Sequence, residues 1–201
     1  MQFVPAGLTL SSAFSTCWGR SPSIATCVLA IVVALIGSSP LAFAFTAVGL
    51  KTSLDNCLNS KLSSAERIEA CNEVIHTNVF PPKTRARINT SRGNASFTSG
   101  NLDSALDDYN KAIVLDPELQ PPLVNRVVTL VRLGKCEQVD SDFRAVLGSD
   151  SHNWRALYGR SLCKAKAGDQ AGAQSDLAAA SAINPNAAQE FAPVEIPRWY
   201  R

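Results

Sequence analysis

The chain carries a 34-residue repeat, present three times between positions 86 and 187. The same residue type recurs without a gap in three columns: Arg92, Arg126 and Arg160; Gly100, Gly134 and Gly168; Asp108, Asp142 and Asp176. Small or apolar residues keep the same register, first at Ala105, Val139 and Ala173, then at Tyr109, Phe143 and Leu177. A unit of this length cannot bury its apolar face alone and must pack against its neighbours. The repeat therefore predicts a solenoid of stacked units.

Each unit has the pattern of two helices joined by a short turn. The repeated glycines suit the left-handed position that ends a helix, and Pro117 and Pro185 stop the helices that precede them. The expected first helices are Arg85–Thr98, Pro121–Leu133 and Asn153–Ala167. The expected second helices are Leu102–Leu115, Glu137–Leu147 and Gln170–Ile183. These patterns predict an all-α fold.

The spacing Ala105-x3-Tyr109, followed by Ala112 and Pro117 and preceded by Gly93, resembles the tetratricopeptide repeat (TPR). The resemblance covers three full repeats, 86–119, 120–153 and 154–187. It implies antiparallel helix pairs that form a right-handed superhelix with a concave face. Two positions of the first helix depart from the family: the usual large aromatic is Asn89, Leu123 or Leu157, and the helix-contact glycine, Gly93, becomes Val127 and Ser161.

The Arg and Asp columns have two interpretations. They could form a ladder of charges that binds a ligand, or each Arg could pair with the Asp of its own unit and tie the two helices of that unit together. Ligand sites rarely demand identical charges in every repeat, so the strict period favours the structural interpretation.

Residues 45–84 are expected to form a degenerate helical hairpin before the repeats. Ser63 and Glu66 have the spacing of a capping box that opens a helix through about Thr77, and a short helix near Thr52–Asn59 would carry Cys57. Pro81 and Pro82 end the unit.

Four cysteines follow residue 44, an even number that suits two disulfides in an exported chain. Three pairings are formally possible. The N-terminal hairpin would bring Cys57 to Cys71, and antiparallel stacking would place Cys136 beside Cys163, so these are the predicted bridges.

The first 44 residues have the three parts of a signal peptide. Arg20 precedes a continuous apolar core, Val28–Ile36, and Ala42 and Ala44 form a small-residue cleavage site. We expect cleavage after Ala44 and a periplasmic or secreted protein. The alternative is an uncleaved segment that anchors the chain in a membrane.

Composition argues against several functions. Nineteen Lys and Arg against 17 Asp and Glu leave a charge of +2 and no basic face for nucleic acid. His76 and His152 are the two histidines, and the sequence has no Gly-rich phosphate loop, metal-spaced cluster or nucleophile elbow. We expect no enzymatic activity, cofactor, metal site or small-molecule substrate.

The TPR resemblance implies a protein or peptide partner bound on the concave face by the first helices. The side chains expected there are Arg87, Asn94, Asn125, Arg132, Arg155, Tyr158 and Lys166, with Thr90, Thr98, Val124, Val128 and Leu162 around them. Some family members clamp a terminal carboxylate, and Asn94, Asn125 and Arg155 match that clamp. Thr90 and Gly159 replace its other two basic residues, so the clamp is incomplete.

Residues 188–201 follow the last repeat as a tail. Pro193 and Pro197 prevent one long helix, so we expect a short turn near Ala187–Phe191 and then an extended segment that covers the last repeat. Two functions remain open. The chain is either an exported scaffold or adaptor that binds a protein segment in its groove, or a structural, self-associating envelope protein whose groove holds its own tail or a second copy.

Overall fold

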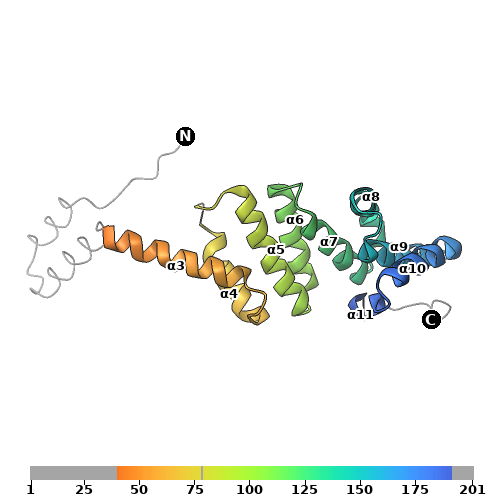
Figure 1. Cartoon of the computed structure of the whole chain (residues 1–201), viewed down its shortest axis with the longest axis horizontal. Helices are drawn as coiled ribbons and strands as arrows, with labels where there is room; N and C mark the ends of the chain where they lie inside the picture. The colour runs from red at the N-terminus through yellow and green to blue at the C-terminus, as the bar shows by residue number, and fades with distance from the viewer. Residues whose placement is uncertain (1–39, 78, 192–201) are drawn as a thin grey trace, which may run out of the picture. The chain divides into compact units, whose positions relative to one another are not determined.

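The computed structural model describes residues 40–77 and 79–191, so the apolar core of the predicted signal peptide lies outside the described residues. Every regular element in these ranges is a helix (Figure 1). The N-terminal helices are α3 (Pro40–Leu58) and α4 (Ser64–Ile75). The three repeats follow as α5 (Pro82–Thr98), α6 (Leu102–Leu115), α7 (Gln120–Arg132), α8 (Asp140–Ser149), α9 (Trp154–Lys166) and α10 (Gln170–Ile183), and a short α11 (Ala187–Phe191) closes the described part.

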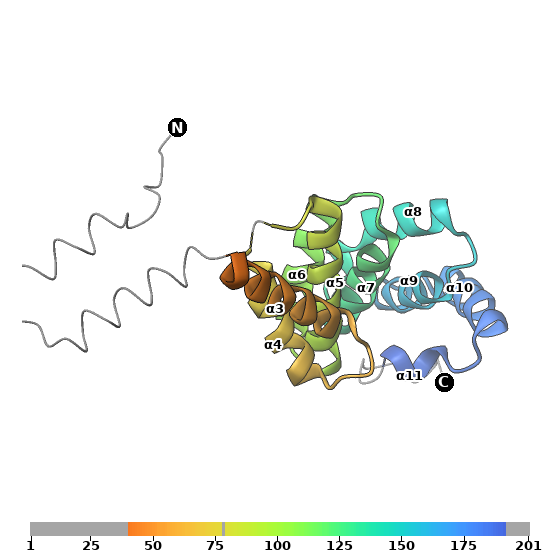
Figure 2. The ribbon, with the colours of Figure 1, turned by 60° about the vertical axis from the view of Figure 1, so that its left-hand side comes forward.

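The helices pack as antiparallel pairs, with α5 against α6 and α9 against α10 (Figures 1 and 2). The expected bounds of α6 and α10 are confirmed, and α5, α7 and α9 begin or end within a few residues of the expected positions. Among the described residues, no helix is both long enough and apolar enough to cross a membrane.

The repeated glycines end the first helix of each unit in the same way. Gly100, Gly134 and Gly168 have φ angles of 80°, 71° and 86°, in the region where a side chain is strained. The residue after each glycine donates its N–H to a carbonyl five residues earlier, as in the bond of 2.9 Å from Asn101 to Ser96. This is the Schellman arrangement that the glycine column predicts.

The Arg and Asp columns tie helices together, as the structural interpretation predicts. Arg92 holds Asp108 through two hydrogen bonds, Nε–Oδ2 at 2.9 Å and Nη2–Oδ1 at 2.6 Å. The equivalent bonds join Arg126 to Asp142 at 2.8 and 2.7 Å and Arg160 to Asp176 at 2.7 Å each. The three carboxylates are buried, so each pair is stronger than the exposed ion pair that sequence alone allowed.

The second helix of the middle repeat differs from the expectation of one helix over Glu137–Leu147. A 3₁₀ turn spans Cys136–Gln138, and α8 begins only at Asp140. Tightened 3₁₀ turns are common at helix N-termini. In this turn Cys136 is bonded to Cys163 of α9, with a Cα–Cα distance of 5.4 Å.

The N-terminal hairpin has the expected capping box and disulfide. Ser63 Oγ accepts from the N–H of Glu66 at 3.3 Å, Glu66 Oε2 accepts from the N–H of Ser63 at 2.9 Å, and Cys57 is bonded to Cys71. The helix that carries Cys57 is longer than the expected Thr52–Asn59, because α3 begins at Pro40.

Candidate peptide-binding groove

A cavity of about 230 Å³ lies between the first helices α5 and α7, where the sequence predicts the groove. Helices α5, α6, α7 and α11 contribute its walls: Asn94, Phe97, Thr98, Tyr109, Asn125, Val128 and Glu190. The cavity therefore has polar, apolar and carboxylate walls, and its volume is enough for a few side chains.

Asn94 is the centre of a hydrogen-bond network in this cavity. Its Oδ1 accepts from the Tyr109 hydroxyl at 2.9 Å and from Asn125 Nδ2 at 2.7 Å. Burial, together with the charge of the neighbouring Asp108, raises the pKa of Tyr109, so its hydroxyl stays a donor. Two of the residues that match a carboxylate clamp are therefore bonded to each other.

Arg155, the third residue that matches the clamp, binds a carboxylate of its own chain. Its Nε donates to Glu190 Oε1 of α11 at 2.7 Å, and its guanidinium lies 4.7 Å from the ring centroid of Trp154. The ring and the carboxylate together fix the position of the guanidinium at the mouth of the cavity.

Tyr158 contacts the residue that follows Glu190. Its ring centroid lies 5.0 Å from that of Phe191, and Phe191 is 0% exposed. Gly159 also lies beside this ring, since a Cβ atom built on it would be 3.4 Å from Phe191 Cε1. The short helix α11 contacts α9 and α7 and turns back beneath them (Figure 2).

Arg132 lies at the edge of the same region. Its guanidinium carbon is 4.6 Å from the centroid of the Phe97 ring, one of the walls of the cavity. Its Nε is buried and has no hydrogen-bond partner among the described residues. Arg132 therefore contacts a wall residue of the cavity without lining the cavity itself.

Of the seven predicted groove residues, Asn94 and Asn125 line this cavity and the other five do not. Arg87 is exposed and lines a neighbouring cavity of about 320 Å³ that also includes Asn94. Lys166 donates to the carbonyl of Gly134 at 2.8 Å and so caps the end of α7. The structure joins Asn94 to Asn125, whereas Arg155 and Tyr158 contact Glu190 and Phe191 of α11. Arg132 contacts Phe97, and Lys166 has its bond outside the cavity.

Sequence reasoning did not place Glu190 in the groove, although the repeat period carries a signal for it. Ala187 lies one repeat period after Asn153, and Phe191 lies one repeat period after Leu157. The helix α11 therefore begins where the first helix of a fourth unit would begin. We expected Phe191 to cover α10, whereas it is packed on α9; the rest of the tail lies outside the described residues.

Several solved structures of MamA share this arrangement of helices. MamA AMB-1 has a TM-score of 0.56 at 11% identity, over 72% of this chain and 78% of that chain. MamA MSR-1 has a TM-score of 0.56 at 13% identity, over 72% of this chain and 82% of that chain. A MamA mutant has a TM-score of 0.57 at 11% identity, over 75% and 86% of the two chains.

No protein-family model and no curated protein matches the chain. At 11–13% identity the likeness to MamA concerns the fold alone. Together with the constant repeat period, the glycine caps and the paired helices, it shows an all-α, TPR-type helical solenoid.

Proposed function

We propose that the chain is an exported protein-interaction scaffold that binds a segment of a partner protein in the groove lined by α5, α7 and α9. A TPR-type solenoid supports a role in protein interaction. One observation supports the finer proposal: the short helix α11 contacts α7 and α9, and its Glu190 lines the cavity. Arg155 binds the carboxylate of Glu190, and the ring of Tyr158 packs against that of Phe191.

The contacts of α11 indicate the chemistry that the groove accepts. A carboxylate and an adjacent aromatic side chain each find a partner on α9, and Arg132 adds a cation whose Nε has no hydrogen-bond partner among the described residues. The Asn94 network presents amide groups rather than charges to the rest of the cavity. We therefore propose that the partner segment is short, acidic and aromatic, and that it competes with α11 for the end of the groove.

The second candidate is a structural, self-associating protein, and the same observation favours one form of it. If α11 stays in place, the groove is filled by the chain's own tail. If α11 exchanges between copies, the groove holds a second molecule. The two candidates therefore differ in the occupant of the groove: a different protein for the scaffold, or this chain itself for the self-associating protein.

A photo-crosslinker at Thr98 tests the proposal, because Thr98 lines the cavity, is exposed and does not belong to the Asn94 side-chain network. The matched control places the crosslinker at Ala178, an exposed residue of α10. We expect mass spectrometry to identify a discrete partner protein from Thr98 and not from Ala178. Crosslinks from Thr98 to this chain alone would support the self-associating candidate and contradict the scaffold.

Export is the second part of the proposal. Two disulfides support an oxidising compartment, where such bonds persist. We propose that a signal peptidase cleaves after Ala44, which would leave α3 to begin at Phe45. N-terminal sequencing of the exported protein should yield Phe45 as the first residue. Recovery of Met1 instead would favour the membrane anchor.

A further inference from the structure

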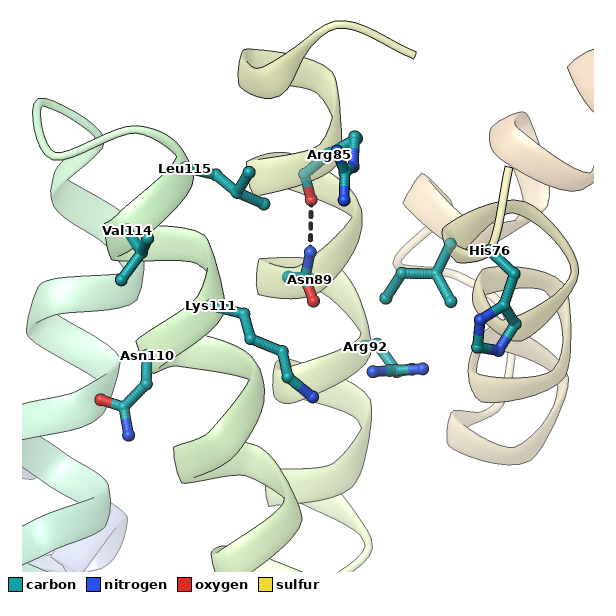
Figure 3. A pocket seen from close by; sticks show the side chains of 9 residues that line it. His76, Arg85, Asn89, Arg92, Asn110, Lys111, Val114 and Leu115 are labelled. Atoms are coloured by element: carbon teal, nitrogen blue, oxygen red, sulfur yellow. Dashed lines mark hydrogen bonds between the residues drawn. The ribbon is translucent and has the colours of Figure 1, made fainter. Parts of the chain in front are cut away.

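A second, larger cavity lies on the other side of α5, between α4 and α6 (Figure 3). Its volume is about 560 Å³, which falls within the roughly 300–1,000 Å³ of sites that bind small molecules and short segments. Arg85 lines this cavity, and Asn94 of the groove follows nine residues later, about two and a half helical turns along α5. The two side chains therefore leave opposite faces of the same helix.

The residues of this cavity break the pattern of the repeat. Asn89 stands where the other repeats have Leu123 and Leu157, and both leucines belong to or pack against the apolar core of α7–α9. Lys111 stands where the other repeats have Ala145 and Ala179. Polar side chains are therefore found in the first repeat alone at two positions that elsewhere are apolar. A leucine at position 89 would supply apolar packing where the first repeat has a carboxamide.

Asn89 is 3% exposed and only half satisfied. Its Nδ2 donates to the carbonyl of Arg85 at 2.8 Å, which fixes the orientation of the amide. Its Oδ1 has no hydrogen-bond partner among the described residues, and neither has Nε of Arg85, one turn earlier (Figure 3). Buried polar atoms are rarely left unbonded. An acceptor and a donor one turn apart match the N–H and C=O of a single residue in an extended segment, which point to the same side.

Besides Asn89, the cavity is lined by cationic and apolar side chains together with Asn110 and His76. Arg85, Arg92 and Lys111 contribute positive charge, and within the described ranges no carboxylate lines the cavity. Arg92 is held by Asp108, whereas Lys111 pairs with Asp107 at the surface. An exposed pair of this kind contributes little to stability, so Lys111 can exchange its partner for a ligand at small cost.

The apolar part of the cavity is formed by Ile75, Val114 and Leu115. Val114 is 82% exposed, which is unusual for a branched aliphatic side chain beside a cavity of this size. A ligand with an apolar side chain would remove this surface from water.

We propose that this cavity binds a short acidic peptide segment of a second partner, on the opposite face of α5 from the groove. The main-chain N–H and C=O of one extended residue of the segment would bond to Asn89 Oδ1 and Arg85 Nε. Its carboxylate would lie near Lys111, and its apolar side chain would contact Ile75, Val114 and Leu115. The proposal does not depend on what occupies the groove.

An NMR titration of the ¹⁵N-labelled, oxidised protein tests this site. The probe is an N-acetylated tetrapeptide amide of alternating glutamate and leucine, added to millimolar concentration. We expect saturable shifts at the Asn89 side-chain amide and along α4 and α6. Asn89→Leu restores the residue of the other repeats, and it should bind at least about tenfold more weakly while melting no lower than the wild type.

Lys111→Glu should weaken binding, whereas Arg144→Glu should not. Arg144 is the matched control because it forms the same type of exposed pair, with Asp140, on α8. The proposal is overturned if the wild type shows no saturable shifts, or if Asn89→Leu binds as tightly as the wild type. Equal losses in the two charge variants would mean non-specific attraction and would also overturn it. So would displacement of the probe by a peptide with the sequence of Pro185–Phe191, because that peptide belongs in the groove.

Discussion

The first repeat and the two that follow share one backbone plan but bury different side chains. The face of α5 that is buried carries small and polar residues, among them Asn89, Thr90, Ser91 and Ser96. The equivalent face of α7 carries Val127, Val128, Leu130 and Val131, which belong to one apolar core with α8, α9 and Phe191. The same repeat period is therefore compatible with two ways of holding helices together.

Hydrogen bonds replace apolar packing where α5 meets the N-terminal hairpin. Ser91 Oγ donates to the carbonyl of Cys57 at 2.5 Å and accepts from Arg67 at 2.8 Å. Arg92 reaches Asn72 of α4 at 2.7 Å in addition to Asp108. Polar contacts of this kind are directional and leave space, and the larger cavity lies at this junction. The comparison shows that apolar packing holds the later repeats together, whereas directional hydrogen bonds hold the first repeat to the hairpin beside a cavity.

The largest expected effect concerns the apolar core. Phe143 is almost fully buried and occupies in the second repeat the position of Tyr109 in the first. Phe143→Ala should lower the free energy of unfolding by about 3–5 kcal/mol, because it leaves a cavity among packed side chains. Urea denaturation followed by circular dichroism measures this loss. Phe143→Leu keeps most of the volume and should lose less; equal losses in the two variants would contradict a cavity effect.

The disulfides should have the next largest effect, and a similar one in both regions. Cys57 and Cys71 are separated by 14 positions in the sequence, and Cys136 and Cys163 by 27. On the chain-entropy model, the Cys71→Ser and Cys163→Ser variants should lose about 3 and about 3.5 kcal/mol. Thermal unfolding with and without reductant measures each bridge, and reductant should lower the melting temperature of the wild type most. Four free thiols in the unfolded, unreduced protein would show that neither bridge forms.

In the polar region, removing one hydrogen bond at the position equivalent to Phe143 should lower the free energy of unfolding much less. Tyr109→Phe removes one hydrogen bond to Asn94 Oδ1, which still accepts from Asn125 at 2.7 Å. No buried group is left unsatisfied, so the expected loss is only about 0.5–1.5 kcal/mol. A loss as large as that of Phe143→Ala in the same urea experiment would mean that the network, rather than the apolar core, dominates stability.

The smallest effect is a dependence on acid in the last repeat. Burial would raise the pKa of Asp176, but hydrogen bonds from Arg160 and Lys164 outweigh it and hold this pKa below its usual value. A carboxylate with a lowered folded-state pKa stabilises the protein above its unfolded pKa, about 3.9, and this stability is lost as the pH falls through the folded pKa. Unfolding midpoints measured from about pH 5 downward should fall less steeply in Asp176→Asn than in the wild type. Parallel curves would show that Asp176 is not responsible.

The sequence was sufficient to predict the features that recur in all three repeats, because the same residue type stands at the same position in each. The glycine, arginine and aspartate columns gave the caps and the helix ties, because each of these roles requires one residue type at one position. The capping box at Ser63 and the disulfide pairing followed from the hairpin geometry in the same way.

The errors lie where tertiary context outweighs local pattern. The 3₁₀ turn at Cys136 has no distinct composition. Glu190 and Phe191 could not be assigned to the groove from the apolar content of the tail, because their partners, Arg155 and Tyr158, lie far back in the sequence on α9.

The most direct test of the account is binding of a groove segment in trans. The double variant Glu190→Arg, Phe191→Ala removes both contacts of α11 from the full chain and should free the end of the groove. Fluorescence anisotropy with a labelled peptide of the sequence Pro185–Phe191 should show saturable binding to this variant and weaker binding to the wild type. A further Arg155→Glu change should abolish it. Equal binding to wild type and variant, or binding that survives Arg155→Glu, would contradict the claim that this groove accepts an acidic, aromatic segment.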